Sequence, residues 1–436
     1  MDIAIIGAGW AGLAAAVRLH QTGHRVRVYE AAAAPGGRAR RVEHPGLGLA
    51  IDNGQHILLG AYTETLALMR WLGIDPDTAL LAQDLRLRAA DGHLDLRFWA
   101  LPAPWHRLGV LLGSRGLDGW RGRRHLARVF GVLNPARIDP ALTVSDWLAG
   151  LGCPPDLLMR LWDPLCVAAL NTPAGSAQAC LFARVLADSL GAGPAASRIL
   201  IPRDGLHALW PAQACARLGD ALQRRRVRAI APCLAGGWQV DDDRHDAVIL
   251  AVPVTEARRL LAPLPDAAGF LAGWSDPAQS AIGTLSLKLV RPWESGQPML
   301  LLRDAPGQHA WGQWLFDRSA SARQPADRHL VHVVIGVADR YAGQEPAGIA
   351  AGVIAQVRSQ AQAGGLPPLP AIETHALVTE RRATFDAVPG LRRPGAATPW
   401  PGLWLAGDWT DTGYPAVLEG AVRSGLGAAQ ALLATA

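Results

Sequence analysis

Residues 2–41 read DIAIIGAGWAGLAAAVRLHQTGHRVRVYEAAAAPGGRARR, and this stretch specifies the architecture of the chain. Its apolar beginning at 3–6 predicts a buried strand, and residues 26–29 predict a second strand that ends on Glu30. A glycine turn and a helix rich in small residues lie between them. This order of strand, glycine turn, helix and strand is typical of a dinucleotide-binding unit, so we expect an α/β fold of the Rossmann type.

The glycine turn has the spacing G-x-G-x-x-G, formed by Gly7, Gly9 and Gly12. Gly7 permits the tight turn, Gly9 lets the backbone approach a pyrophosphate, and Gly12 lets the helix pack closely on the strand. The free N–H groups at the start of the helix, which begins with Trp10 and Ala11, then face the anion. We therefore predict that these five residues bind a cofactor.

Two features beyond the turn complete this cofactor site, and the second of them favours FAD over NAD. Glu30 lies 18 residues past Gly12, at a strand end where its carboxylate accepts hydrogen bonds from ribose hydroxyls and disfavours a 2′-phosphate. The glycine pair in the sequence PGGR at 35–38 lets the backbone close on the pyrophosphate from the other side. Arg38 adds positive charge to this binding site.

A second informative segment, GLWLAGDWTDTGYPAVLEGAVRSG, occupies residues 402–425. It predicts a short buried strand at 403–406, after which a glycine clears space and an aspartate binds a ribityl hydroxyl. The EGA sequence at 419–421 predicts the start of a helix whose small residues let backbone N–H groups approach the edge of a flavin ring. The cofactor-binding residues expected here are Gly407, Asp408, Val417 and Leu418.

These two segments together resemble those of the FAD-containing amine oxidase and phytoene desaturase superfamily. The resemblance covers both ends of the chain and implies FAD as the cofactor. It also implies a Rossmann-type FAD-binding domain like that of glutathione reductase, with an interleaved α+β substrate domain.

The pattern between the two segments indicates that the chain crosses between domains several times. We expect a discontinuous FAD-binding domain formed by 1–60, 201–260 and 391–436, and a substrate-binding domain formed by 61–200 and 261–390. The first part of the substrate domain has helical periodicity, and the second part alternates strands with one helix.

Three segments are expected to complete the cofactor domain. Residues 51–56, IDNGQH, predict a strand and a turn that returns to the flavin ring, and 248–253, VILAVP, predict a fully buried strand. Residues 227–230 predict a strand that passes the adenine. The cofactor contacts expected from these segments come from Gly54, Gln55 and Val227.

Composition limits the choice of partners. The chain has 436 residues, 50% of them hydrophobic and 18% charged, which is typical of a globular protein with sizeable cores. The net charge of +5 is mild and no aromatic-basic nucleic-acid motif is present, so no nucleic acid partner is expected and anionic lipid is favoured instead.

Cysteine usage predicts neither a disulfide framework nor a metal site, because the five cysteines are odd in number and lack C-x-x-C spacing. Reduced thiols indicate a cytoplasmic protein. The apolar N-terminus has no basic leader or cleavage site, so we expect it to be a strand rather than a signal peptide. No apolar run reaches the length of a transmembrane helix, so any membrane contact is expected to be monotopic, on the inner face of the cytoplasmic membrane.

Two middle segments favour an apolar substrate. Residues 161–173, LWDPLCVAALNTP, are mostly apolar, which indicates either a hydrocarbon pocket or an ordinary buried helix with a proline-terminated end. Residues 98–120, FWALPAPWHRLGVLLGSRGLDGW, interleave tryptophans and arginines, which suits a membrane interface or a lid over a core.

Two departures from the amine oxidase pattern favour a hydrocarbon wall at the flavin. Amine oxidases typically carry an aromatic residue two positions before the Glu of EGA, where this chain has Val417. Their lysine near the flavin N5 corresponds to Thr284, and the only lysine, Lys288, is displaced.

The segments DNGQH at 52–56, LWDPLCVAALNTP at 161–173, PRDGLHALWP at 202–211 and GQWLFDR at 312–318 narrow the resemblance. They look like those of the squalene-associated FAD-dependent desaturases, the hydroxysqualene dehydroxylases of squalene and hopanoid synthesis. This resemblance implies reduction of hydroxysqualene, a C30 isoprenoid, to squalene with loss of water.

Such a reaction needs a hydride donor, supplied by the flavin, and an acid that protonates the departing oxygen. The candidate acids are His56, Asp163 and Tyr414. Each has a structural alternative: His56 orients the flavin, Asp163 caps a helix before Pro164, and Tyr414 is a packed wall.

Other functions stay open on the sequence alone. A carotenoid-type desaturase uses the same fold on a polyene, a flavin amine oxidase is a further alternative, and a non-enzymatic flavoprotein or isoprenoid carrier is another. No second glycine fingerprint for NAD(P)H is present, so we expect electrons to come from an external donor such as a bound reductant, a quinone or a partner protein.

Overall fold

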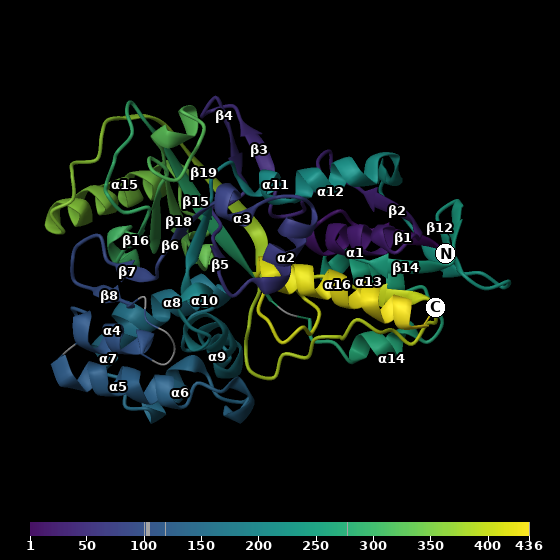
Figure 1. The fold of residues 1–436 in the computed structure, drawn as a ribbon, viewed down its shortest axis with the longest axis horizontal. Helices are drawn as coiled ribbons and strands as arrows, with labels where there is room; N and C mark the ends of the chain where they lie inside the picture. Colours follow the sequence, from purple (N-terminus) through teal and green to yellow (C-terminus); the bar gives the residue numbers. More distant parts are fainter. Residues whose placement is uncertain (100, 102–104, 118, 277, 436) are drawn as a thin grey trace.

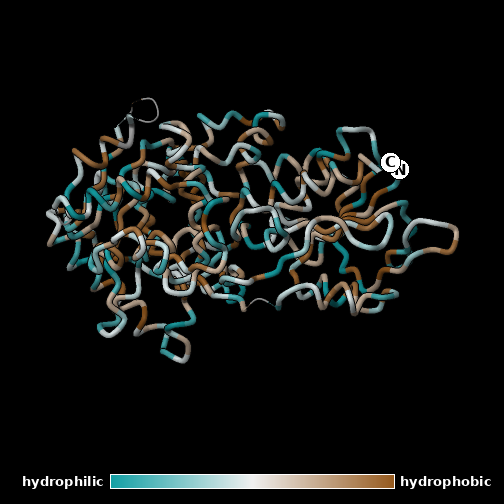
Figure 2. The backbone as a smooth tube through the Cα atoms, turned by 90° about the horizontal axis from the view of Figure 1, so that it is seen from below, coloured by the Kyte–Doolittle hydropathy of each residue, from teal (hydrophilic) through white to brown (hydrophobic). Residues whose placement is uncertain are grey.

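A parallel five-stranded sheet forms one half of the computed structural model, which describes residues 1–99, 101, 105–117, 119–276 and 278–435. Its strand order is β10-β2-β1-β14-β20, and every neighbouring pair runs parallel. Both chain termini lie at this end of the molecule (Figures 1 and 2). The strands are β1 (Asp2–Ile6), β2 (Arg25–Glu30), β10 (Leu222–Arg224), β14 (Ala247–Leu250) and β20 (Leu403–Leu405).

The parallel sheet is covered on both faces, which explains why its central strands are apolar without interruption. Ile3 and Ile5 of β1 pack in one core cluster with α1 (Trp10–Gln21) and α16 (Leu418–Thr435). Ala4 and Ile6 face the opposite cluster, which contains buried residues of α13 (Val254–Leu261). The α/β, Rossmann-type fold predicted from residues 2–41 is thereby confirmed.

A three-stranded antiparallel sheet lies on the α13 side of the parallel sheet. It consists of β11 (Ile230–Pro232), β12 (Trp238–Val240) and β13 (Asp243–His245). The strand expected at 227–230 is wrong, because only Ile230 belongs to a strand. The backbone N–H groups of Arg228 and Ala229 donate to the Asp241 carboxylate at 2.8 and 2.9 Å, so this side chain takes the donors that a β-ladder needs.

The other half of the molecule contains an antiparallel sheet of order β16-β17-β18-β15-β19. One face of this sheet packs on α15 (Pro346–Ala363), with Leu285 and Val333 of the sheet against Val353 of the helix. The opposite face is turned toward the main cavity. The strands are β15 (Gln279–Leu289), β16 (Met299–Leu301), β17 (Trp314–Asp317), β18 (Leu330–Ile335) and β19 (Ile372–Phe385).

A layer of helices closes this half at the end away from the termini (Figure 1). Among the described residues, no helix has both the length and the apolar character required to cross a bilayer. The elements of the layer are α4 (His106–Gly113), α5 (Gly119–Gly131), α6 (Val144–Gly150), α7 (Pro155–Leu157), α8 (Asp163–Leu170), α9 (Ala179–Leu186) and α10 (Pro194–Ser197), with π-helical turns η2 (Leu158–Trp162) and η3 (Ala187–Gly191).

The helical periodicity expected over 61–200 is interrupted by strands. β6 (Leu80–Gln83) pairs with β9 (Ile199–Pro202), and β7 (Arg86–Arg88) forms a hairpin with β8 (Asp95–Arg97). An Arg86–Asp95 ion pair, with N–O distances of 2.7 and 2.8 Å, links the two strands of the hairpin. The pairing of β6 with β9 joins residues distant in sequence, which a local periodicity does not reveal.

The segment 161–173 also differs from the single proline-terminated helix that its sequence predicts. A π-helical turn ends at Trp162, and α8 continues only to Leu170. Asn171 ends the helix in the left-handed conformation, with φ 48°. Its side-chain Oδ1 accepts from Val337 N–H at 2.7 Å and its side-chain Nδ2 donates to the Thr384 hydroxyl at 2.9 Å. Tertiary hydrogen bonds, and not Pro173, therefore determine where the helix stops.

Smaller elements connect the two halves. They are β3 (Arg41–His44), β4 (Leu49–Asp52), β5 (Leu58–Leu59), α2 (Thr63–Trp71), α3 (Pro76–Ala79), α11 (Leu206–Leu209), α12 (Pro211–Leu218) and α14 (Ala267–Ala272).

Glu419 joins the last helix to the first half of the chain. Its side chain is fully buried in the first turn of α16. Its two oxygens accept from the backbone N–H groups of Glu64 and Thr65, each at 3.0 Å, and from the Thr65 hydroxyl at 2.7 Å. Arg423 supplies a counter-charge at 2.9 Å. The carboxylate therefore satisfies free donors at the N-terminus of α2.

We expect Glu419→Ala to destabilise the protein by about 3–5 kcal/mol, because it leaves buried donors and the Arg423 charge without a partner. Glu419→Gln keeps an acceptor and costs less. Urea unfolding of both variants measures this difference, with the exposed Glu345→Ala as the matched control. A Glu419→Ala protein as stable as the control would contradict this role.

Candidate active site

One cavity of about 740 Å³ extends from the parallel sheet to the antiparallel sheet and the helical layer. Its first part lies at the carboxyl ends of the parallel strands, where open α/β sheets bind their ligands. The cofactor-binding residues predicted from sequence that line it are Gly7, Gly9, Trp10, Ala11, Glu30, Arg38, Gly54, Gln55, Val227, Gly407, Asp408, Val417 and Leu418. Gly12 is not a lining residue; it packs α1 against the turn.

The glycines of the turn have different physical roles. A Cβ on Gly12 would lie 1.9 Å from the Gly7 carbonyl oxygen, and Gly7 itself has φ 106°, so the fold requires both glycines. A Cβ on Gly9 would meet nothing closer than Gly37 Cα at 3.9 Å. The chain therefore has room for a side chain at Gly9, and the space it leaves open borders the cavity.

The start of α1 supports the same interpretation. Gly9 is its N-cap, no side chain caps the helix, and its first turn contains no acidic residue. Free backbone N–H groups at a helix start attract a phosphate group. The bare turn, the room at Gly9 and the uncapped helix together fit the pyrophosphate of a dinucleotide cofactor.

Glu30 is held in place by the backbone while it keeps capacity for a ligand. Its two oxygens accept from Ala8 N–H at 2.8 Å and from Ala32 N–H at 2.7 Å. A carboxylate has about four acceptor positions, so two remain for hydroxyl groups such as those of a ribose.

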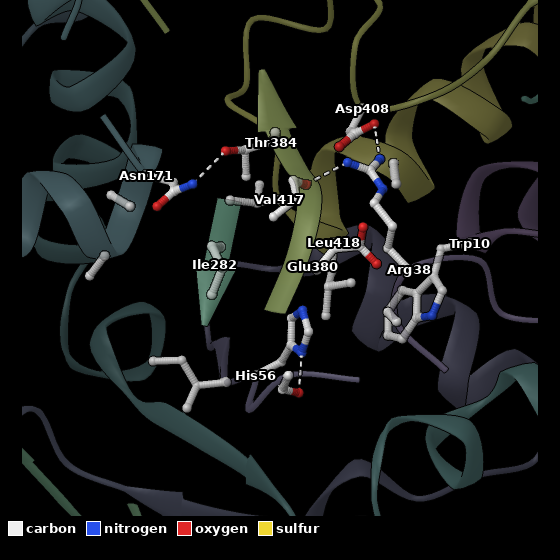
Figure 3. A pocket seen from close by; sticks show the side chains of 18 of the residues that line it. Trp10, Arg38, His56, Asn171, Ile282, Glu380, Thr384, Asp408, Val417 and Leu418 are labelled. Carbon is white, nitrogen blue, oxygen red and sulfur yellow. Dashed lines mark hydrogen bonds and ion pairs between the residues drawn. The ribbon is translucent and has the colours of Figure 1, made fainter. Parts of the chain in front are cut away.

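Arg38 and Asp408 line the cavity and bind each other (Figure 3). The guanidinium donates to the Asp408 carboxylate at 2.5 Å and to the Ala383 carbonyl oxygen at 2.6 Å. The Asp408 charge raises the pKa of Arg38. The pair therefore links residue 38 near the start of the chain to residue 408 near its end at one wall of the site.

His56 is the candidate acid that borders the cavity. Its Nδ1 lies 2.8 Å from the Gly54 carbonyl oxygen, which can only accept, so Nδ1 carries a hydrogen. Figure 3 shows the other ring nitrogen pointing into the cavity, toward the space that Glu380 and Leu418 also border. Burial lowers the pKa of His56, and Arg38 lowers it further. The ring is therefore mostly neutral at neutral pH.

Asp163 and Tyr414 are both described, and neither lines the cavity. Asp163 accepts from Ala174 N–H at 2.7 Å, and burial raises its pKa, in the direction that its apolar neighbours predict. Tyr414 donates its hydroxyl hydrogen to Asp188 at 2.5 Å, and burial raises its pKa to about 12. Both polar groups thus have partners within the protein. Asp163 does not cap α8, whose N-cap Trp162 makes no side-chain cap hydrogen bond, and Tyr414 does not form a wall of the cavity.

Glu380 and Tyr62 are among the ionisable residues that border the cavity and that the sequence does not single out. Glu380 lies on β19 opposite Ile282 of β15 and accepts from the Asn53 amide at 3.1 Å. Burial raises the pKa of the Tyr62 hydroxyl. Glu380 stands in the charged run TERR at 379–382, which predicts a solvent-exposed strand, and only strand pairing brings it to the site.

The second part of the cavity is apolar. Among the described lining residues between 59 and 199, no side chain carries a charge. Ser189 and Ser197 donate their hydroxyl hydrogens to backbone carbonyl oxygens, so they do not offer these hydrogens to a ligand. The apolar lining comes from the helical layer and the antiparallel sheet, and includes Leu87, Phe98, Val110, Leu126, Phe130, Leu161, Trp162, Leu165, Phe182, Leu186, Met299, Trp314 and Phe316.

The residues that depart from the amine oxidase pattern lie as the sequence suggests. Val417 and Thr284 both line the cavity. Lys288 does not; its amine pairs with Glu373 at 2.8 Å. The wall where an amine oxidase carries an aromatic residue and a lysine is therefore formed here by a valine and a threonine.

A buried anchor holds the loop that carries His56. Asp52 accepts from Leu206 N–H with both oxygens, at 3.1 Å. Arg318 donates to the carbonyl oxygens of Pro202 and Arg203 at 2.7 and 3.0 Å. Three segments noted in the sequence, at 52–56, 202–211 and 312–318, thus meet beside the site. Burial raises the pKa of Asp52 to about 6.

Comparisons with known proteins agree with this geometry. The model of the flavin containing amine oxidoreductase family matches residues 10–433. The chain is 33% identical to hydroxysqualene dehydroxylase of Rhodopseudomonas palustris and 31% identical to that of Sinorhizobium fredii, covering 99% of this chain and 98% of each relative. It is also 24% identical to zeta-carotene desaturase of a Synechocystis species, over 100% of this chain and 97% of that protein.

Solved structures show the same fold. A putrescine oxidase triple mutant superposes with a TM-score of 0.71 at 18% identity, covering 100% of this chain and 99% of that one. Cyclohexylamine oxidase from Brevibacterium oxydans superposes with a TM-score of 0.67 at 20% identity, with the same coverage.

Alanine at Gly9 and at Gly12 should separate cofactor binding from folding. We expect Gly12→Ala to lower the Tm of the apoprotein strongly, because its Cβ meets a carbonyl oxygen. Gly9→Ala should keep the apoprotein Tm within a few degrees but lose flavin absorbance after purification. A Gly9→Ala protein that retains flavin, or an equal loss of Tm in both variants, would contradict this assignment.

The raised pKa of Asp52 predicts a pH-dependent stability. The Asp52 carboxyl binds its proton more tightly in the folded protein than in the unfolded chain. The contribution of Asp52 to the free energy of unfolding therefore falls as pH rises from about 4 through 6. Asp52→Asn keeps an acceptor for Leu206 and removes the titration. Relative to the parent, we expect its free energy of unfolding to rise by about 2 kcal/mol between about pH 4.5 and pH 7. Urea unfolding across this range tests the prediction, and a pH-independent difference would refute it.

Proposed function

The chain belongs to the flavin containing amine oxidoreductase family, and we propose that it is an FAD-dependent enzyme that reduces hydroxysqualene to squalene with loss of water. The observation that carries the proposal is the two-part cavity. A glycine-rich end that fits a dinucleotide continues into an end lined by hydrocarbon side chains. The relatives of matching length named hydroxysqualene dehydroxylase support the substrate.

An uncharged lining suits a C30 isoprenoid. Each CH₂ group that leaves water contributes about 0.8 kcal/mol, so binding energy accumulates along the chain of the substrate without polar contacts. A charged amine would gain no counter-charge along the described lining between 59 and 199. We therefore assign the substrate-binding role to the cavity-lining parts of 61–200 and 261–390, and cofactor binding to 1–60, 201–260 and 391–436.

The reaction replaces a C–O bond by a C–H bond and releases water. Reduced FAD, when bound, supplies the hydride. The oxygen must gain a proton in order to leave, and His56 is the residue we assign to this step. Its Nδ1–H is committed to Gly54, so the nitrogen that gains and gives the proton is Nε2, which faces the cavity. The apolar surroundings exclude water from the electron-poor carbon that forms.

Electrons reach the enzyme from an external donor in this proposal, because the sequence contains one glycine fingerprint and we assign it to FAD. We also propose that the enzyme works in the cytoplasm at the inner face of the cytoplasmic membrane, where a hydrocarbon product dissolves.

A carotenoid-type desaturase is the second candidate, favoured by the full-length similarity to a zeta-carotene desaturase and by the same apolar lining. The two reactions run in opposite redox directions. An amine oxidase finds less support, since Val417 and Thr284 stand at its aromatic and lysine positions.

Anaerobic incubation of the photoreduced holoenzyme with hydroxysqualene tests the proposal. We expect squalene in the extract and reoxidised flavin, in equal amounts. The oxidised holoenzyme with phytoene or ζ-carotene is the matched comparison, and flavin bleaching there without squalene formation would favour the desaturase. If no donor reduces the flavin and the substrate binds but is recovered unchanged, the protein is a non-enzymatic isoprenoid carrier.

His56→Gln should lower the rate of squalene formation by about 10²–10⁴-fold while flavin binding is kept. In the parent, the rate should fall about tenfold for each pH unit above the lowered pKa of His56, because only the imidazolium donates a proton. The pH profile of single-turnover flavin reoxidation measures this. Glu380→Gln is the control. If the pH dependence of flavin reoxidation disappears in Glu380→Gln and not in His56→Gln, Glu380 is the proton donor instead of His56.

A further inference from the structure

We propose that the outer face of α4 and α5 docks on an anionic lipid bilayer, and that the hydrocarbon substrate enters the cavity through this helical wall. The second part of this inference rests on the proposed function; the first does not. The docking face is defined by Trp99, Leu101, Trp105, Leu112 and Trp120.

Large apolar side chains are exposed together on this face. Trp105, Leu112 and Trp120 are 59, 65 and 66% exposed, and Trp99 and Leu101 about 40%. Trp99 lies against α4, since a Cβ on Gly109 would contact its ring, so Trp99 and the helix form one surface. Exposed tryptophan and leucine clustered in this way indicate an interaction surface, and tryptophan favours the interface between water and lipid.

The charge around the docking face selects an anionic partner. Residues 97–137 contain eight arginines and one acidic residue, a net charge of +7, which exceeds the +5 of the whole chain. Several arginines of this segment are exposed, among them Arg115, Arg121 and Arg124. The Arg124 guanidinium carbon lies 6.0 Å from the centre of the Trp120 ring. Basic residues beside aromatic and aliphatic side chains are typical of a helix lying in the headgroup region of a membrane.

The inner side of the same helices lines the apolar part of the cavity. On α4, Val110 lines the cavity while Leu112 is exposed. On α5, Leu126 and Phe130 line the cavity while Trp120 is exposed. One layer of helix, about 10 Å thick, therefore separates the docking face from the substrate end of the cavity.

This arrangement favours a bilayer over other occupants. A C30 hydrocarbon dissolves in the lipid phase of a membrane. The docking face would contact that lipid, and the apolar part of the cavity lies directly behind the docking face. Figure 1 shows α4 and α5 at the end of the molecule away from the termini and the parallel sheet, so docking there leaves the cofactor half in water.

Sedimentation of the FAD-loaded protein with phosphatidylglycerol vesicles tests docking without any substrate. We expect binding at least tenfold tighter than to phosphatidylcholine vesicles, weakening at high ionic strength. The triple variant Trp105→Ser, Leu112→Ser and Trp120→Ser should lose about tenfold or more, while Leu234→Ser, an exposed leucine on the β11–β12 hairpin, binds like the parent. Flavin absorbance and Tm confirm that each variant is folded.

The alternatives are separated in the same series. Equal binding to neutral and anionic vesicles, or a triple variant that binds like the parent, would overturn the proposal. A parent dimer that the triple variant breaks, seen by light scattering without vesicles, would show that a second copy covers the face.

An activity comparison separates docking from the proposed function. With hydroxysqualene in detergent micelles, the triple variant should match the parent, and with hydroxysqualene embedded in vesicles it should be about tenfold slower. No squalene from the parent in either form would refute the proposed function and leave the vesicle-binding result standing. Equal vesicle activity of parent and variant would refute entry through the docking face.

Discussion

The uncapped start of α1 is the feature on which the rest of the structure depends. Its free N–H groups need an anion, and the chain brings two glycine turns together, at Gly9 and Gly36, to leave room for one. β1, α1 and β2 place this site at the carboxyl edge of the parallel sheet, and β14 and β20 extend the same edge. The Arg38–Asp408 pair and the buried Glu419 then join late segments of the chain to this early unit. A cofactor placed here has its position determined by backbone groups rather than by mobile side chains.

The second half of the molecule adds an apolar end to this polar site. One face of the antiparallel sheet packs on α15 and the other lines the cavity, and the helical layer completes the enclosure. Two polar side chains of the wall are satisfied internally, because Trp162 donates to His125 at 2.9 Å and Asn171 hydrogen-bonds Ser280, Thr384 and Val337. The indole N–H of Trp314, which also lines the cavity, is buried without a hydrogen-bond partner among the described residues. This matters because a buried polar group without a partner costs free energy and would favour water in the pocket. The inner side of the wall is mainly apolar, while the docking face of α4 and α5 is apolar and basic on the outside.

Local patterns predicted the cofactor end well, because each of its signals is contained in a short stretch. Gly7, Gly9 and Gly12 act through backbone geometry that depends on spacing alone, and Glu30 follows from the length of one βαβ unit. The candidate acids were harder to place, because proximity to a cavity is set by packing. Asp163 and Tyr414 have suitable chemistry but turn to Ala174 and Asp188, whereas Glu380 reaches the site through strand pairing. Val227 lines the cavity as expected but belongs to no strand, since a distant aspartate takes the donors of the two residues that follow it.

The order of residues by itself predicted a dinucleotide-binding α/β fold, a flavin family and an apolar substrate, since glycine spacing and hydrophobic content act locally. The fold and the family are confirmed. Folding in three dimensions established which polar groups meet the cavity, where α8 stops, and that the helices with exposed tryptophans are the same helices that line the hydrocarbon end. The physical reason is that these properties depend on contacts between segments far apart in the chain. A side chain such as that of Glu419 or Asp52 has its role defined by the backbone donors it finds there, more than 150 residues away.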